Sequence, residues 1–280
     1  MLPVMLQLYN VREDLKKDFD GTLMQIAEMG YKYVELAIYA HTDTHIGESY
    51  GKTADEVKAS LDKAGLKTVS AHVPIKGMLE DPESVISFHI DVGCKFIAIP
   101  SLRPEDFTPG PNYDGIKKTV SLLGEEVKKR GGLLLYHNHD FEFVDYNGKL
   151  ILDDFYDSIP SDLLQAQMDT CWVRVGGVNP VEYLPKYSGR LPIVHLKDFD
   201  PSKGGTIKSE KELMEEAKKA KAAREFPFRA VGHGIQDIPA IIKASEQAGA
   251  KWLVVEQDIP TQGKTALECA KESLDYLNSL

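Results

Sequence analysis

Six residues whose side chains can bind a metal or move a proton stand within or just after short apolar runs of this sequence. They are Glu35, His72, His137, Asp169, His195 and Glu256. Short apolar runs bounded by turn residues are typical of buried strands. If the strands are parallel, their C-terminal ends lie on one face, so residues far apart in the sequence meet in one pocket. The pattern therefore indicates an enzyme.

The residue types favour a hard cation at this pocket. Carboxylates and imidazoles without a thiolate suit manganese, magnesium, cobalt or iron(II), and zinc is an alternative. One divalent ion is the economical interpretation. The motifs of other site classes are absent: the sequence has no GxSxG, and Gly176-Gly177 lacks the GxGxxG pattern of dinucleotide sites. Gly232-His233-Gly234 is typical of a tight loop at a strand end, which could meet a phosphate or a hydroxyl.

The run from Val194 to Asp198 contains two inward-facing polar residues. Alternate residues of a strand share a face, so His195 and Lys197 are expected to point into the barrel while Leu196 packs outward. Buried lysines are almost always paired. Lys197 therefore either pairs with an acid that fills the barrel or contacts a substrate.

Three acidic residues have two interpretations each. Asp169 ends an apolar run, where it either projects into the pocket or caps the next segment, and Thr170 could be the cap instead. Glu256 follows four apolar residues, and its burial is costly unless it is paired or binds a cation. Glu35 lies inside a strand, where a substrate ligand and a barrel-floor ion-pair partner are equally plausible.

The densest polar cluster is the run from Tyr136 to Glu142. His137 and His139 share one face of this run, and Glu142 can return to the pocket through the turn that follows. For His72, contact with a substrate hydroxyl is favoured over a buried histidine of the core.

Strands and helices must alternate to bring these residues together. The predicted strands are 4–8, 33–37, 68–73, 96–99, 133–137, 163–168, 192–196 and 252–255. The predicted helices are 17–29, 53–64, 81–92, a long helix ending at 130, 180–186, 238–248 and 265–278. Eight such units predict a parallel α/β fold, the (β/α)8 TIM barrel, as a single domain over residues 1–280.

Two segments interrupt the repeat. Residues 141–152 read as a hairpin with a type I′ turn at Asn147-Gly148. Residues 200–227 read as an insertion with a Lys/Glu-rich helix near 209–224, which could act as a lid over the ends of the last two strands.

Composition excludes several classes of partner. The net charge of −10 opposes binding to nucleic acid. The sequence contains no run of 18 apolar residues, so no membrane span is expected. Three scattered cysteines indicate reduced thiols and a cytoplasmic setting. Tyr183 and Tyr187, expected to be exposed, are compatible with a homodimer interface or with ordinary packing.

The ordered motifs resemble one superfamily over essentially the whole chain. They are Tyr136-His137-Asn138-His139-Asp140-Phe141-Glu142-Phe143, Met168-Asp169-Thr170-Cys171-Trp172, His195-Leu196-Lys197-Asp198-Phe199, Gly232-His233-Gly234 and Glu256. Together they resemble the sugar phosphate isomerase/epimerase superfamily of xylose-isomerase-like TIM barrels. The resemblance implies one divalent ion, with manganese as first choice, held by Asp169, His195, Glu256 and Glu142. Because His137 occupies the usual place of the first glutamate, His137 is the alternative to Glu142.

The resemblance also implies chemistry on a small carbohydrate. We expect an isomerase or epimerase that removes a proton next to a carbonyl, with Glu256 or Glu142 as base and Lys197 stabilising an oxyanion. The expected substrate-binding residues are Glu35, His72, His137, His139 and His233. The alternatives are a lyase, dehydratase or hydrolase acting on an inosose or 3-keto-glycoside, and a non-catalytic carbohydrate-binding barrel.

Overall fold

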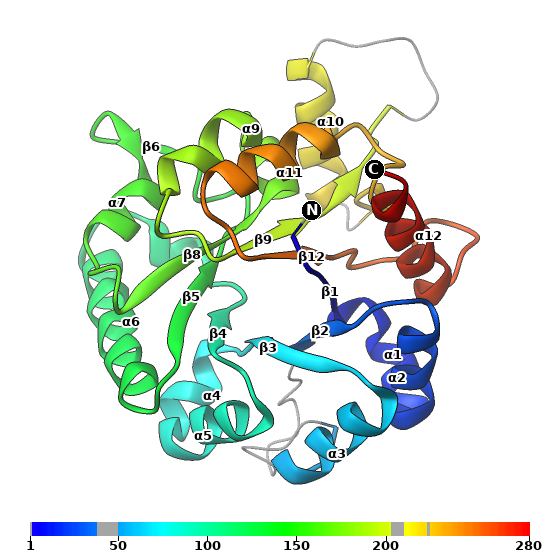
Figure 1. The fold of residues 1–280 in the computed structure, drawn as a ribbon. Helices are drawn as coiled ribbons and strands as arrows, with labels where there is room; N and C mark the ends of the chain where they lie inside the picture. Colours follow the sequence, from blue (N-terminus) through cyan, green and yellow to red (C-terminus); the bar gives the residue numbers. More distant parts are fainter. Residues whose placement is uncertain (1, 38–49, 203–209, 223–224) are drawn as a thin grey trace.

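Eight parallel strands form a closed barrel in the order β1-β12-β9-β8-β5-β4-β3-β2, and helices surround it (Figure 1). The computed structural model describes residues 2–37, 50–202, 210–222 and 225–280. The barrel strands are β1 (Val4–Gln7), β2 (Tyr33–Ala37), β3 (Lys67–His72), β4 (Phe96–Ile99), β5 (Leu133–His137), β8 (Leu164–Asp169), β9 (Ile193–Leu196) and β12 (Trp252–Val255). The predicted TIM barrel fold is confirmed.

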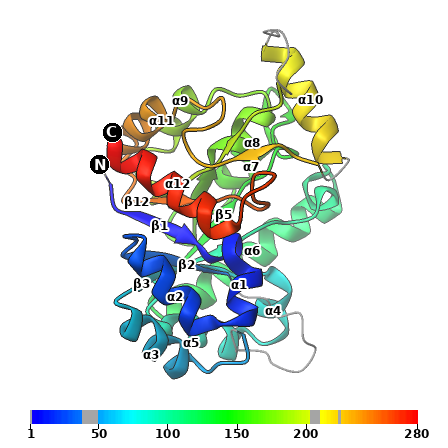
Figure 2. The ribbon, with the colours of Figure 1, turned by 90° about the vertical axis from the view of Figure 1, so that its right-hand side faces the viewer.

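Helices cover the outside of the barrel (Figure 2). With α10 described below, the α-helices are α1 (Arg12–Lys17), α2 (Phe19–Glu28), α3 (Ala54–Ala64), α4 (Ile75–Glu80), α5 (Pro82–Val92), α6 (Pro111–Lys129), α7 (Ile151–Asp157), α8 (Thr170–Val175), α9 (Pro180–Tyr183), α11 (Ile238–Gln247) and α12 (Ala266–Ser279). Short 3-10 turns are η1 (Leu8–Val11), η2 (Pro104–Phe107) and η3 (Leu184–Tyr187). Among the described residues, no helix has both the length and the apolar character needed to cross a bilayer.

Local capping explains several helix boundaries. Thr53 and Thr265 each form a capping box with the glutamate three residues later, so α3 and α12 begin where those side chains satisfy free N–H groups. The predicted helix 17–29 begins instead at Phe19, because Asp18 accepts a hydrogen bond from the Gly21 N–H and separates α1 from α2.

The inner face of the barrel changes from apolar to polar along several strands. Met5, Ala98, Leu135, Ile193 and Val254 form a buried apolar cluster inside the barrel. Side chains alternate along a strand, so the next inward position lies two residues further on. After Leu135, Ile193 and Val254 that position holds His137, His195 and Glu256, respectively. The apolar layer thus supports the site from below.

A small excursion follows β9. Strand β10 (Asp198–Phe199) pairs antiparallel with β11 (Phe228–Arg229), and α10 (Glu210–Ala222) lies between them in the chain, above the barrel in Figure 2. Trp172, Met214 and Phe226 belong to the apolar cluster that joins this excursion to α8. Lys221 of α10 forms an ion pair with Asp140, on the loop after β5. Residues 203–209 and 223–224 of the predicted insertion lie outside the described residues.

The hairpin is present but shifted. Its strands are β6 (Asp145–Tyr146) and β7 (Lys149–Leu150), and Asn147 and Gly148 have φ of 55° and 83°, as a type I′ turn requires. Ile151 and Leu152, predicted to finish the hairpin, instead begin α7 (Ile151–Asp157). Helices α4 and α8 were also not predicted, because six-residue helices carry too little periodicity to identify them.

Tyr183 and Tyr187 are buried, which corrects the expectation that they are exposed. Their hydroxyls donate to Asp153 Oδ1 at 2.7 and 2.6 Å. Two tyrosines that share one buried carboxylate are packing residues of this fold, so they do not support an interface. The three cysteines are buried and unpaired, as predicted.

Candidate active site

Four side chains from neighbouring barrel strands converge at the C-terminal end of the barrel. Potential ligand atoms of His137, Asp169, His195 and Glu256 all lie within 4.8 Å of one another. His137 Nε2 is 3.6 Å from Asp169 Oδ2 and 3.8 Å from Glu256 Oε2. The parallel register sets this proximity, since it places Asp169 beside His195 on adjacent strands.

Asp169 has two roles that the sequence presented as alternatives. Its Oδ1 accepts hydrogen bonds from the N–H groups of Cys171 at 2.8 Å and Trp172 at 3.0 Å, and so caps α8. Its Oδ2 is buried and receives no hydrogen bond from the described residues. Thr170 is not the cap, because its hydroxyl donates to the His195 carbonyl. Burial raises the pKa of Asp169 to about 7.

His195 lies between two carboxylates. Its Nδ1 is 2.7 Å from Glu256 Oε2, and its Nε2 is 2.9 Å from Glu35 Oε2. Burial alone would lower the pKa of His195, but the two carboxylates raise it to about 10. Histidines that bind metals are commonly oriented by a carboxylate on the other ring nitrogen. Glu35 is in that position.

Glu35 is fully buried in the barrel floor. Of the two predicted roles, substrate ligand and barrel-floor ion-pair partner, this position agrees with the second. Gln7 donates to one carboxylate oxygen of Glu35 at 2.6 Å, and Ser70 and Gln167 donate to the other at 2.6 Å. Gln7 and Gln167 were not identified from the sequence. The signal for Gln167 was its position two residues before Asp169, on the same inward face.

The floor network also fixes the proton on His72. The Gln167 amide N–H₂ donates to Glu35, so its Oε1 accepts, and His72 Nε2 lies 2.7 Å from that oxygen. His72 Nε2 therefore carries the hydrogen, and Nδ1 keeps its lone pair. Burial lowers the pKa of His72, and the ring is neutral at pH 7.

Lys197 is buried at the edge of the four-residue cluster, facing inward as predicted. Its Nζ lies 3.5 Å from Asp169 Oδ2, 3.6 Å from Glu256 Oε2 and 2.9 Å from Asp258 Oδ1. Burial would lower the pKa of Lys197, but the three surrounding carboxylates raise it well above its usual value. The same ammonium group holds the pKa of Glu256 low against the effect of burial. Both groups are thus charged at pH 7.

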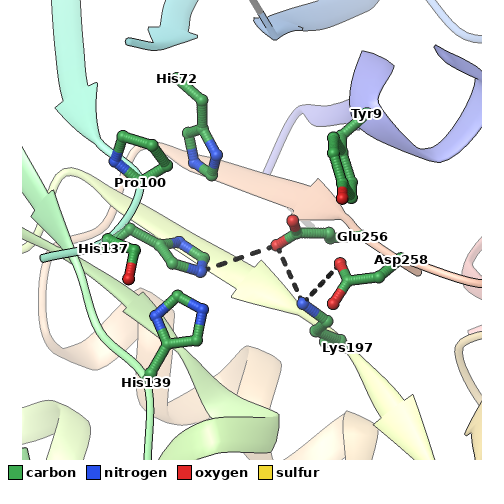
Figure 3. Close-up of a pocket in the computed structure, with 9 residues that line it drawn as sticks. Tyr9, His72, Pro100, His137, His139, Lys197, Glu256 and Asp258 are labelled. Carbon is green, nitrogen blue, oxygen red and sulfur yellow. Dashed lines mark ion pairs between the residues drawn. The ribbon is translucent and has the colours of Figure 1, made fainter. Parts of the chain in front are cut away.

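A pocket of about 230 Å³ opens above this cluster (Figure 3). Its lining residues are Tyr9, His72, Pro100, Ser101, His137, His139, Lys197, Glu256 and Asp258. His139 stacks on Trp172 with the ring centres 5.6 Å apart, and burial lowers its pKa to about 3. Neutral imidazoles and one ammonium are thus directed at a cavity large enough for a small polyol. Tyr9, Ser101 and Asp258 were not predicted, because Tyr9 lies in the four-residue turn η1 and the other two lie in loops, and neither the turn nor the loops carry a periodic signal.

Glu142 lies outside the cluster. Its two oxygens accept hydrogen bonds from the Tyr136 hydroxyl at 2.5 Å and from the His139 N–H at 2.8 Å. Burial raises the pKa of Glu142 to about 8. The structure places His137, the alternative left open by the sequence, beside Asp169, His195 and Glu256. Glu142 instead supports the loop that carries His139.

His233 does not line the pocket. It is exposed, and its ring centre lies 6.4 Å from that of Tyr276. The surrounding glycines bind a carboxylate of the protein itself: the N–H groups of Gly232 and Gly234 donate to Asp198 Oδ2 at 3.0 and 2.9 Å. The tight loop does meet an anion, but that anion is Asp198.

The cluster fits a divalent cation. Asp169 Oδ2 is buried and accepts no hydrogen bond from the described residues, although Lys197 Nζ lies 3.5 Å away, and such an acceptor is the kind that a cation satisfies. The spread of the ligand atoms, within 4.8 Å, is close to the roughly 4.2 Å between opposite ligands at bond lengths of about 2.1 Å. Two carboxylates and two imidazoles suit manganese, iron(II), cobalt or zinc. His137, Asp169, His195 and Glu256 are the residues that would hold it.

Known proteins resemble the chain in both sequence and fold. Inosose dehydratases from Clostridium botulinum and Clostridium beijerinckii are 26% and 25% identical to it over 266 and 273 residues, covering 87% of this chain and 86% of each relative. The solved structure of a sugar phosphate isomerase/epimerase from Parabacteroides distasonis superimposes with a TM-score of 0.77 at 22% identity, covering 100% of this chain and 99% of the other.

A family model decides the assignment. The model described as xylose isomerase-like TIM barrel matches residues 23–280. This range contains β2 and every later barrel strand, including the three that carry His137, Asp169 and His195 and the strand that Glu256 directly follows. The chain therefore belongs to the xylose isomerase-like TIM barrel family.

Proposed function

We propose that the protein is a divalent-metal-dependent enzyme that removes a proton next to the carbonyl group of a small keto-sugar or keto-polyol. The observation that carries the proposal is the convergence of His137, Asp169, His195 and Glu256 from neighbouring strands beneath a polar pocket. A bound divalent ion would supply Lewis-acid stabilisation of negative charge on the substrate oxygens.

Glu256 is the proposed base. It lines the pocket, and the adjacent Lys197 and His195 keep it ionised against the effect of burial, which by itself would raise its pKa. Its Oε2 contacts His195 and Lys197, while Figure 3 shows the other oxygen directed toward His72 and Tyr9. Glu142, the other predicted base, lacks a free oxygen and does not line the pocket.

Three further residues would orient the substrate. Lys197 can donate to an oxygen on which negative charge develops, because its ammonium group faces the pocket. His72 offers the Nδ1 lone pair to a substrate hydroxyl, since its Nε2 is bonded to Gln167. His139 lines the same pocket and is held by stacking on Trp172.

After the proton is removed, the substrate either eliminates water or rearranges to an isomer or epimer. We place dehydration of an inosose-like keto-polyol first, because the curated relatives named above are inosose dehydratases. Isomerisation or epimerisation, the first expectation from the sequence, is the second candidate, and it needs the same base and the same oxyanion stabilisation.

The test is to incubate the protein with Mn²⁺ in D₂O and to follow inososes, keto-sugars and 3-keto-glycosides by proton NMR. We expect exchange of a carbon-bound proton next to the carbonyl, loss of exchange with a chelator, and recovery when Mn²⁺ is restored. Glu256→Gln should slow exchange by roughly 100-fold or more. Tight sugar binding by metal-free protein without exchange would support a carbohydrate-binding barrel instead.

A further inference from the structure

The Lys197 ammonium group has two sets of anionic partners. On one side are Asp169 Oδ2 and Glu256 Oε2, at 3.5 and 3.6 Å. On the other side is Asp258 Oδ1, which is closer, at 2.9 Å (Figure 3). The first two carboxylates belong to the proposed metal cluster, and Asp258 does not. Asp258 therefore competes with the metal ligands for the same positive charge.

Asp258 is held in place by the segment after β1. The Asp258 carbonyl accepts a hydrogen bond from Arg12 Nη1 at 2.8 Å, and the N–H of the preceding Gln257 donates to Asn10 Oδ1 at 3.0 Å. These bonds fix the loop after β12 independently of Lys197. The backbone that carries the Asp258 carboxylate is thus held by contacts other than the ion pair with Lys197.

Aromatic rings limit the other movements of Lys197. Its Nζ lies 5.1 Å from the ring centre of Trp172 and 5.3 Å from that of Phe228, distances at which a cation is attracted to the ring face. Of the carboxylates paired with this ammonium group, only those of Asp169 and Glu256 remain if Asp258 loses its charge. Both would attract the ammonium group toward the space between them.

We propose that Asp258 is a positioning residue that holds Lys197 clear of the space between Asp169 and Glu256, so that a divalent cation can bind there. The inference rests on the proposed function, because it assumes that these two carboxylates hold the ion. It adds that the affinity of the site for metal is set by a residue that is not a ligand.

The test is a double-mutant cycle on Mn²⁺ binding alone, with free Mn²⁺ measured by electron paramagnetic resonance. We expect Asp258→Asn to weaken binding roughly tenfold or more, because the ammonium charge then opposes the cation at short range. Lys197→Met should tighten binding. In the Lys197→Met background, Asp258→Asn should have little further effect, since no ammonium group remains to relocate.

Two controls separate positioning from a general loss of charge or of fold. Asp258→Glu should retain most of the affinity. Asp140→Asn removes a carboxylate from the Lys221 pair, and should leave Mn²⁺ binding close to that of the unmodified chain. Circular dichroism checks that each variant is folded.

Two results would overturn the inference while leaving the proposed function intact. One is an equal loss of affinity from Asp258→Asn with and without Lys197, which would mean simple charge removal. The other is unchanged affinity in Asp258→Asn. If the unmodified chain bound no Mn²⁺, the proposed function itself would fail, and the inference with it.

Discussion

At the scale of single residues, the site is built around a charge imbalance. Asp169, Glu256 and Glu35 lie within one buried region, and the cations beside them in the structure are His195 and Lys197. The Asp169 carboxylate shows the consequence, since one oxygen caps α8 and the other has no donor among the described residues. A divalent cation would bind this oxygen and balance the charge.

The role of Glu142 can be separated from that of His137 by substitution. Glu142→Gln should still bind one Mn²⁺ per chain, because its oxygens contact Tyr136 and the His139 N–H rather than the cluster. His137→Ala should lose most of the affinity. Isothermal titration with Mn²⁺ measures both. Loss of binding in Glu142→Gln together with retention in His137→Ala would restore Glu142 as the ligand.

At the scale of elements, short loops after the strands position the site. The loop at Gly232–Gly234 holds the Asp198 carboxylate directly after Lys197, with N–H groups of Gly232, Gly234 and Gln236 donating to it. This arrangement anchors the start of the β10–β11 excursion. Because the loop N–H groups already donate to Asp198, they are not available to bind a substrate phosphate.

The anchoring loop should tolerate no side chain at Gly234. A Cβ there would lie 2.2 Å from Asp198 Oδ1 and 2.5 Å from the Phe199 carbonyl oxygen. Gly234→Ala should therefore lower the free energy of unfolding by about 1–3 kcal/mol, measured by denaturant titration. The control is Gly115→Ala in α6, where nothing lies within 4 Å, and which should be neutral or stabilising. Equal stability of the two variants would contradict this account.

At the scale of the whole molecule, stability should fall in mild acid because of a histidine far from the chemistry. His89 is fully buried in α5, and burial lowers its pKa to about 4. Between pH 6.5 and pH 4 the unfolded chain binds the proton and the folded chain does not, so stability is lost as the pH falls. The loss approaches about 3 kcal/mol below pH 4.

His89→Gln isolates this effect. The difference in unfolding free energy between the variant and the unmodified chain, measured by denaturant titration at pH 7 and pH 4, should shift in favour of the variant by a few kcal/mol. A difference that is the same at both pH values would mean that His89 does not titrate between them.

The sequence predicted the barrel because each unit repeats the same signals. Apolar strands, capped helices and stop glycines such as Gly65 and Gly93 recur with one period, and each is a local property of the chain. The same regularity placed Asp169, His195 and Glu256 at strand ends. Local patterns thus determine which residues can converge.

The remaining contacts depend on distances between strands, which no local pattern encodes. Glu142 was preferred over His137 from its place after the strand, yet the chain folds it back onto Tyr136. Gln167 and Asp258 contact Glu35 and Lys197, residues from other strands, so their importance is visible only in the closed barrel. The choice of partner is a property of the assembled molecule.

The central claim is that one divalent ion is held by His137, Asp169, His195 and Glu256. The direct measurement is anomalous X-ray diffraction at the manganese absorption edge from crystals grown with Mn²⁺. We predict a single peak within bonding distance of these four side chains, with Glu35 still on the outer nitrogen of His195. A peak at Glu142 in place of His137 would contradict the ligand set, and no peak near Asp169 and Glu256 would contradict the metal-dependent mechanism.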